Sequence, residues 1–176
     1  MSSALLIIAQ NNYQDRELEG TRKGLIAAGF DVVLASSEAG TCTGKFGGSE
    51  VATIALKDVR IDAYERIAFI GGPGAEALVT HEEALRIARE AAASGTPLGA
   101  ICIAPLILAA AGVLQGKQAT VWDDGYGTQI RELERAGAIF VDAPVVEDGL
   151  LLTGNGPAAA GAFGKRLAKM DGKKHL

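Results

Sequence analysis

Short, uninterrupted apolar runs that alternate with segments of helical periodicity are the strongest constraint on this fold. Runs of this kind are typical of strands that are covered on both faces. They occupy residues 4–9, 31–35, 66–70 and 97–101. Amphipathic segments between the runs predict helices from Glu17 to Ala28 and from about Thr80 to Ala93. This alternation predicts an α/β fold with a doubly wound, mostly parallel sheet and right-handed crossovers.

Local signals indicate where these elements begin and end. Gly29 is a natural stop for the first helix, and the pattern Thr80–Glu83 matches a capping box at the start of the second. The segment from Thr41 to Leu56 breaks the alternation and predicts a hairpin. Later in the chain we expect a strand at 119–122, a helix at about 128–136, paired strands near 139–146 and 150–153, and a last helix from 157.

Composition and charge restrict the class of protein. The chain has 176 residues, of which 48% are hydrophobic, which suits one domain spanning residues 1–176 with a frayed tail at 171–176. A formal charge of -4 without a basic stripe argues against nucleic-acid partners and against a polybasic membrane patch. The first apolar run is too short for a signal peptide or a membrane span, so we expect a cytoplasmic protein.

The two cysteines, Cys42 and Cys102, have neither metal-ligand spacing nor a plausible disulfide framework, so both are expected to be thiols. Cys42 lies in the predicted hairpin and is assigned a structural role. Cys102 ends the apolar run 97–101, and a helical pattern follows it directly and stops at Gly112. A side chain at such a corner faces the cleft beside the first helical amides, which favours a thiolate. The alternative is a buried structural cysteine.

Three segments are expected to meet beyond the carboxyl ends of the parallel strands, where such sheets place their functional crevice. They are the residues that lead from Gln10 to Glu17, the loop Gly71–Gly74, and Cys102. Glycines after a strand allow backbone amides to approach a ligand closely, and two such amides would form an oxyanion hole. The alternative, above all for Gly74, is that the glycine only makes the turn.

Two other kinds of site compete with a cysteine nucleophile. The segment Gly72–Ala77 matches the dinucleotide fingerprint, but Pro73 removes an amide from that loop and no acid ends the next strand, so no cofactor is expected. A base beside the cysteine would have to come from His81 or His175, which lie in the predicted capping box and in the tail. Glu17 remains the main acid/base candidate, and its alternative is an ordinary acid favoured by the helix dipole.

These features in this order resemble the ThiJ/PfpI superfamily, whose members include the parkinsonism-associated protein deglycase and the PfpI-type intracellular proteases. The resemblance spans nearly the whole chain. It implies a flavodoxin-like sandwich, a homodimer or larger homo-oligomer, and a reactive cysteine at a nucleophile elbow. The matching motifs are Glu17 at the opening of a helix, Gly71-Gly72 after a strand, Ala-Ile-Cys102-x-x-Pro105, Ala111-Gly112-Val113-Leu114 and Leu151-Leu152-Thr153-x-x-Gly156-Pro157.

Matched by position, the resemblance implies that Glu17 is the carboxyl beside the thiolate and that Gly72 and Ile103 supply the oxyanion-hole amides. Glu76 matches the acid that protease members lend to a neighbouring subunit. Two positions depart from the pattern: PfpI-type proteases have histidine where this chain has Ile103, and the deglycase branch has histidine at the position of Trp122. Proteolysis is therefore disfavoured, and the family's histidine-assisted chemistry lacks its imidazole.

What remains is the pair of Glu17 and Cys102, which we expect to hold one shared proton near neutrality, with the carboxylic acid donating to the thiolate. The leading prediction is a cofactor-free, cytoplasmic oxidative-stress protein that adds to and hydrolyses small carbonyl compounds or their adducts on protein side chains. The alternative is a redox sensor or holdase chaperone that acts through oxidation of Cys102 without turnover.

Overall fold

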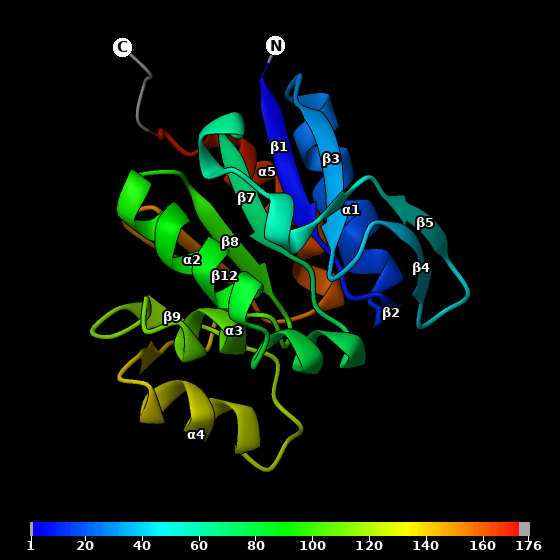
Figure 1. Cartoon of the computed structure of the whole chain (residues 1–176). Coiled ribbons are helices and arrows are strands. Elements are labelled where there is room, and N and C mark those ends of the chain that lie inside the picture. Colours follow the sequence, from blue (N-terminus) through cyan, green and yellow to red (C-terminus); the bar gives the residue numbers. More distant parts are fainter. Residues whose placement is uncertain (1, 173–176) are drawn as a thin grey trace.

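Within residues 2–172, the part of the chain that the computed structural model describes, seven strands form a central sheet with helices on both faces (Figure 1). Across the sheet the strands lie in the order β11 (Val145–Asp148), β12 (Leu151–Gly154), β8 (Leu98–Ile101), β7 (Arg66–Phe69), β1 (Ser3–Ile7), β3 (Asp31–Ser36) and β6 (Ile54–Ala55). Neighbouring strands are parallel apart from the antiparallel pair β11 and β12. The predicted α/β fold with a mostly parallel sheet is therefore confirmed.

The strand order indicates at which end of the parallel strands a functional site is expected. Five parallel strands of this sheet follow one another in the sequence in the order β1, β3, β7, β8 and β12. If they are numbered 1 to 5 in that order, they lie side by side in the order 2-1-3-4-5, which is the flavodoxin-like arrangement. The order reverses between β1 and β7, so a crevice is expected beyond the carboxyl ends of these strands. The four apolar runs of the sequence are β1, β3, β7 and β8. Every residue of β7, β8 and β12 is buried, because helices cover both faces.

Helices α1 (Asp15–Ala27) and α5 (Ala160–Lys169) cover one face of the sheet, and α2 (Glu82–Ser94) and α3 (Pro105–Ala110) cover the other (Figure 1). Helix α4 (Thr128–Arg135) packs on α3. Short 3-10 helices are η1 (Leu56–Asp58), η2 (Ile61–Ala63), η3 (Pro73–Leu78) and η4 (Pro157–Ala159). Helices α1 and α5 approach closely, because a Cβ on Gly24 would lie only 2.6 Å from the carbonyl carbon of Gly164. No helix within residues 2–172 has the length and apolar character needed to cross a membrane.

The predicted hairpin is formed by the antiparallel strands β4 (Gly40–Gly44) and β5 (Ser49–Ala52), and β2 (Asn11–Tyr13) pairs with β4. The strand expected at 119–122 is shorter, β9 (Gln118–Ala119), and it pairs with β10 (Ile139–Phe140) in a separate sheet. The single strand expected at 139–146 is wrong: it is divided into β10 and β11, which belong to different sheets. Pro144 lies just before β11 and cannot donate a ladder hydrogen bond, so the chain leaves one sheet and enters another there.

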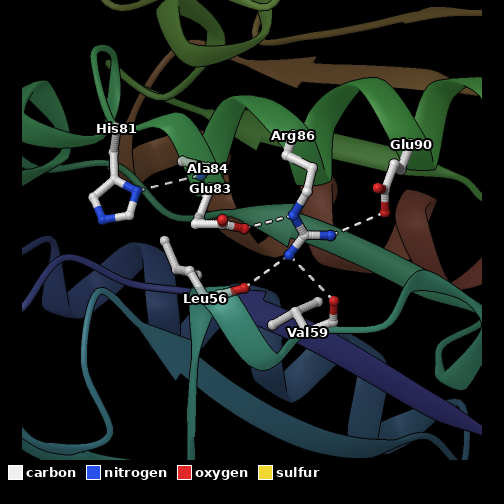
Figure 2. Close-up of polar contacts among 7 residues, drawn as sticks. All are labelled: Leu56, Val59, His81, Glu83, Ala84, Arg86 and Glu90. Atoms are coloured by element: carbon white, nitrogen blue, oxygen red, sulfur yellow. Dashed lines mark hydrogen bonds and ion pairs between the residues drawn. The ribbon is translucent and has the colours of Figure 1, made fainter.

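The residue that caps α2 also differs from the prediction, which put Thr80 in that position. The N-cap is His81, whose Nδ1 accepts from the amide of Ala84 at 3.4 Å (Figure 2). Glu83, expected to complete a capping box, instead accepts from Nε of Arg86 at 2.5 Å. The Arg86 guanidinium attracts this carboxylate away from the helix terminus. His81 therefore holds a helix end. The other histidine, His175, and the tail beyond residue 172 lie outside the described residues.

Candidate functional site

The three segments expected at the carboxyl edge of the sheet lie against one another in the structure. Glu17 follows β1 on α1, Gly71 follows β7, and Cys102 follows β8. A Cβ built on Gly71 would lie 2.5 Å from Cβ of Cys102 and 2.6 Å from Oε1 of Glu17. The amide of Gly71 donates to that same Oε1 at 3.0 Å. The structure thus brings a carboxyl, a glycine loop and a thiol to one point, and no larger residue fits in the place of Gly71.

Cys102 has an unusual backbone conformation, with φ at +66°. A non-glycine residue held in this region costs about 1 to 3 kcal/mol and persists only where the surroundings impose it. Two main-chain hydrogen bonds impose it here. The Cys102 amide donates to the carbonyl of Gly154 at 2.8 Å, and the Cys102 carbonyl accepts from the amide of Trp122 at 2.9 Å. The residue is 5% exposed, so the thiol is almost buried.

The chain after Cys102 departs from the prediction of a helix that begins at once. Helix α3 begins at Pro105, and residues 102–104 form a turn. Proline suits the first helical position because the amide it lacks would have no partner inside the helix. The amides of Ile103 in the turn and of Gly72 in the loop after β7 act on the Cys102 thiol and lower its pKa. These are the two amides that the family resemblance implied for an oxyanion hole.

Glu17 is held in place by Gln14, a residue that the sequence analysis did not single out. The Gln14 side-chain oxygen accepts from the amides of Arg16 at 2.7 Å and Glu17 at 3.2 Å, so Gln14 is the N-cap of α1. Its own amide donates to the carbonyl of Gly71 at 2.9 Å, which joins the helix to the glycine loop. An amide side chain just before a helical segment is the available signal, but glutamine is not among the preferred capping residues.

The glycine loop depends on a second close approach. Gly72 has φ at +105°, and a Cβ at this position would lie 2.5 Å from the amide nitrogen of Gln14. Both the left-handed conformation and the absence of a side chain are needed there. Gly74, whose Cβ would lie 1.8 Å from the carbonyl oxygen of Asn11, is likewise required by packing. The loop can therefore present the Gly72 amide to the sulfur only because these positions carry no side chain.

Burial controls the titration of Glu17. The side chain is 0% exposed. Loss of solvation raises its pKa from an ordinary value of 4.5 to about 7, against the opposing effects of hydrogen bonds from Cys102 and from the Gly71 amide. Within the described residues, Oε2 of Glu17 satisfies no geometric criterion for a hydrogen bond. One oxygen of a buried carboxyl therefore remains available.

The Cys102 thiol is shifted in the same direction. Burial is the largest cause and the negative charge of Glu17 the next, and together they raise its pKa to about 12, while the amides of Gly72 and Ile103 act against them. Between these two pKa values the pair holds a single proton. A thiolate at neutral pH therefore requires that the proton move from sulfur to the Glu17 carboxyl. The two amides favour that transfer, because they stabilise the anionic sulfur.

The remaining candidates lie apart from this pair. Glu76 is exposed on η3. Cys42 is 0% exposed in β4, and its sulfur lies 3.6 Å from Nε2 of Gln10. Trp122, which the resemblance matched to a family histidine, is 38% exposed and is linked to Cys102 through the main chain. In the described part of the chain, no group of three or more His, Cys, Asp or Glu side chains is placed to hold a metal ion.

A cavity of about 1030 Å³ lies at the opposite edge of the sheet, where β7 and β8 begin. Arg66 and Arg86 line it, but their guanidinium groups are already bonded to backbone carbonyls and to glutamates. A ligand would find few free donors there. We therefore place the candidate site at the Cys102 edge, where strain, burial and an available carboxyl oxygen coincide.

The fold and the site together define a flavodoxin-like α/β protein with a buried carboxyl and a cysteine at the carboxyl edge of its sheet. The family model of the DJ-1/PfpI family matches residues 2–170. The chain therefore belongs to the DJ-1/PfpI family, and the resemblance seen in the sequence is confirmed.

Similar proteins carry related names. Deglycase PH1704 of Pyrococcus horikoshii is 32% identical over 166 residues, which are 94% of this chain and 98% of that protein. The glutathione-independent glyoxalase DJR-1.2 of Caenorhabditis elegans is 26% identical over 167 residues, 95% of this chain and 87% of that protein. The crystal structure of Drosophila melanogaster DJ-1beta has a TM-score of 0.85 and 26% identity, and the match covers 96% of this chain and 90% of that chain.

Proposed function

We propose that this protein is a cysteine-dependent enzyme that acts on small carbonyl compounds or on their adducts with protein side chains, without a cofactor. The observation that carries the proposal is the buried pair of Glu17 and Cys102, which holds one proton beside the amides of Gly72 and Ile103. The names of the relatives, deglycase and glyoxalase, support a substrate of this class. In this proposal Cys102 is the nucleophile and Glu17 its proton partner.

The first step follows from the geometry of the pair. The thiol proton passes to Glu17, and the sulfur attacks the carbonyl carbon of an aldehyde. A carbon–sulfur bond forms while the carbonyl electron pair moves to oxygen, which is stabilised by the amides of Gly72 and Ile103. Glu17 then returns its proton to that oxygen, which gives a hemithioacetal. Preformed amides of this kind need no reorganisation as the charge develops.

A substrate with a second carbonyl next to the aldehyde can go further. Two proton transfers, for which the Glu17 carboxyl is in place, convert the hemithioacetal through an enediol into the thioester of a 2-hydroxy acid. Water then cleaves the carbon–sulfur bond, the acid leaves, and the sulfur regains its proton. The sum is the addition of one water to the substrate. These steps use only a carboxyl and a thiol, so they proceed without the imidazole that Ile103 and Trp122 replace.

Turnover of a panel of substrates tests this proposal. Wild-type protein, Cys102→Ser, Glu17→Gln and the control Cys42→Ser would be incubated with methylglyoxal, phenylglyoxal, a methylglyoxal-treated peptide and casein. We expect Cys102-dependent loss of the aldehydes, normal rates in Cys42→Ser and no cleavage of casein, since the groups that act on the Cys102 thiol include no imidazole that could protonate a leaving amine. Aldehyde consumption that persists in Cys102→Ser would contradict the proposal.

A second candidate function is redox sensing or holdase activity through Cys102 without turnover. The feature that favours it is the surroundings of the sulfur, where two amides and a neutral carboxyl would donate to the oxygens of a sulfinate. Mild peroxide should then add two oxygens at Cys102, and Glu17→Gln should shift the product toward sulfenate or sulfonate. Intact-mass and peptide mass spectrometry would decide. An unmodified Cys102 under conditions that oxidise the methionines would exclude this candidate.

The cellular setting is part of the proposal. We infer a cytoplasmic homodimer or larger homo-oligomer with a role in oxidative stress. Exposed apolar side chains offer surface for self-association: Ile26 is 57%, Val51 60% and Phe46 65% exposed. Glu76, exposed on η3, would face a neighbouring subunit if the assembly follows the protease pattern. Light scattering at several protein concentrations would test this, and a strict monomer would overturn it.

A further inference from the structure

The one tryptophan of the chain, Trp122, is attached directly to the turn that carries Cys102. Its amide donates to the Cys102 carbonyl at 2.9 Å, so the two residues share a hydrogen bond and cannot drift apart while the fold is intact. Trp122 is 38% exposed, although the residues before it, Ala119 to Val121, are buried. A large aromatic ring therefore remains partly open to solvent at the edge of the site.

The ring rests on a second segment of the same site. A Cβ on Gly156 would lie 3.6 Å from Cδ1 of Trp122, which is ordinary van der Waals contact with the indole. Two residues earlier, Gly154 accepts the Cys102 amide at 2.8 Å. Cys102 is thus flanked by the Gly154–Gly156 segment and by Trp122, whose indole lies near Gly156. The exposed part of the Trp122 side chain is available to a ligand.

The loop after Trp122 is fixed by its own hydrogen bonds. The Asp123 carboxylate accepts from the amides of Gly125 at 2.8 Å, Gly127 at 2.9 Å and Ile130 at 3.4 Å. These bonds turn the chain into α4 and hold the segment that begins at Trp122. An aromatic side chain on a preorganised backbone loses little entropy when it binds.

Chemistry limits what Trp122 can do in this position. The indole N–H is a donor that does not titrate, so it cannot take over proton transfer from a histidine. Its flat apolar surface can contact a substituent of the substrate, and aromatic pairs contribute about 0.5 to 1.5 kcal/mol beyond the area they bury. We propose that Trp122 is a specificity-determining residue that contacts the substituent on the substrate carbonyl and favours a flat, aromatic one. This inference rests on the proposed function of Cys102.

Kinetics with a matched pair of substrates tests it. Phenylglyoxal and methylglyoxal share the reacting group and differ in the substituent. In Trp122→Ala we expect KM for phenylglyoxal to rise about tenfold, equivalent to ~1.4 kcal/mol, and KM for methylglyoxal to change less than about twofold. Trp122→Phe should recover most of the difference. Ile139→Ala, which removes an apolar side chain that is 55% exposed elsewhere, is the control and should change neither value. Equal changes for both substrates in Trp122→Ala would overturn the inference.

Fluorescence provides a readout that needs no turnover. Because Trp122 is the single tryptophan, its emission in Cys102→Ser reports ligands at this position. Mandelate and lactate, the 2-hydroxy acids that correspond to the two aldehydes, would be titrated. We expect mandelate to change the emission at about tenfold lower concentration than lactate. If the wild type turns over neither aldehyde nor the methylglyoxal-treated peptide, the proposed function fails, but this titration still shows whether Trp122 prefers an aromatic substituent. The absence of any preference for mandelate would overturn the inference.

Discussion

The amino and carboxyl ends of the parallel strands form two edges of the sheet, which differ in how completely their polar groups are hydrogen-bonded. At the amino edge, Arg66 is 9% exposed, and burial lowers its pKa. Its guanidinium donates to the carbonyls of Leu167 at 2.9 Å and Glu65 at 2.7 Å, and also to that of Met170 at the end of α5. Arg86 is bonded to Glu90 at 2.9 Å and to two backbone carbonyls as well (Figure 2). At this edge, hydrogen bonds from the guanidinium groups hold elements together that are far apart in the sequence.

At the carboxyl edge, buried groups are left strained or incompletely bonded. Oε2 of Glu17 satisfies no hydrogen-bond criterion among the described residues, and Cys102 has its φ at +66°. Both features lower stability, and both leave a group free to react. The charge that stabilises this fold and the charge proposed to act in it therefore lie at opposite ends of the parallel strands. Substitutions at the two ends should therefore differ in their effects on activity and on stability.

The largest effect is expected in turnover. Glu17→Gln removes the proton partner of Cys102 and should lower kcat by ~10² to 10⁴-fold, the usual contribution of a general acid or base. Arg86→Met, at the other edge, should leave kcat unchanged while it lowers the melting temperature. Steady-state kinetics with methylglyoxal and thermal unfolding would measure both. A loss of kcat in folded Arg86→Met would show that the two edges are coupled.

The next effect is a pH dependence of stability. Because folding raises the pKa of Glu17 from 4.5 to about 7, the folded state binds this proton more tightly than the unfolded state does. The contribution is fully present below pH ~4 and is lost as the pH rises through the folded pKa, by up to about 3 kcal/mol. Urea unfolding at pH 5 and pH 8 should show wild type losing more stability than Glu17→Gln. Parallel losses would contradict the raised pKa.

A smaller loss is expected at the amino edge. Arg66→Met leaves the carbonyls at the end of α5 without their charged donor and should lower the free energy of unfolding by about 2 kcal/mol at neutral pH. Arg60→Met is the matched control, because that side chain is 79% exposed and, among residues 2–172, pairs only with Asp62 at the surface. It should change stability by less than about 0.5 kcal/mol. Chemical unfolding would measure both, and equal effects would rule out the assigned role of Arg66.

The smallest effect concerns the strained turn. Glycine accepts a φ of +66° more readily than alanine does, so Cys102→Gly should be more stable than Cys102→Ala by about 1 kcal/mol. Cys42 lies in the regular strand β4, where the order should reverse and alanine should be the more stable replacement. Chemical unfolding of the glycine and alanine variants at each cysteine would measure both differences in stability. The same order at both cysteines would mean that the backbone of Cys102 carries no strain.

Much of the fold could be predicted from local pattern. The apolar runs identify β1, β3, β7 and β8 because strands covered on both faces need continuous apolar sequence. A parallel sheet places the residues after these strands at one edge, so the meeting of Glu17, Gly71 and Cys102 follows from the order of the elements alone. The errors are also physical. His81 replaces Thr80 as the cap of α2 because Arg86 takes the carboxylate of Glu83, a competition that the capping pattern does not contain.

Sequence alone therefore determined which residue types stand at the edge of the sheet, since strand and helix periodicity and the order of the elements are local properties. The protonation, hydrogen bonding and position of these residues depend on the tertiary structure. The raised pKa values of Glu17 and Cys102, the available Oε2 and the placing of α1 by Gln14 all depend on burial by elements far apart in the chain. Solvation is lost through the sum of many distant contacts, and no short stretch of sequence specifies that sum.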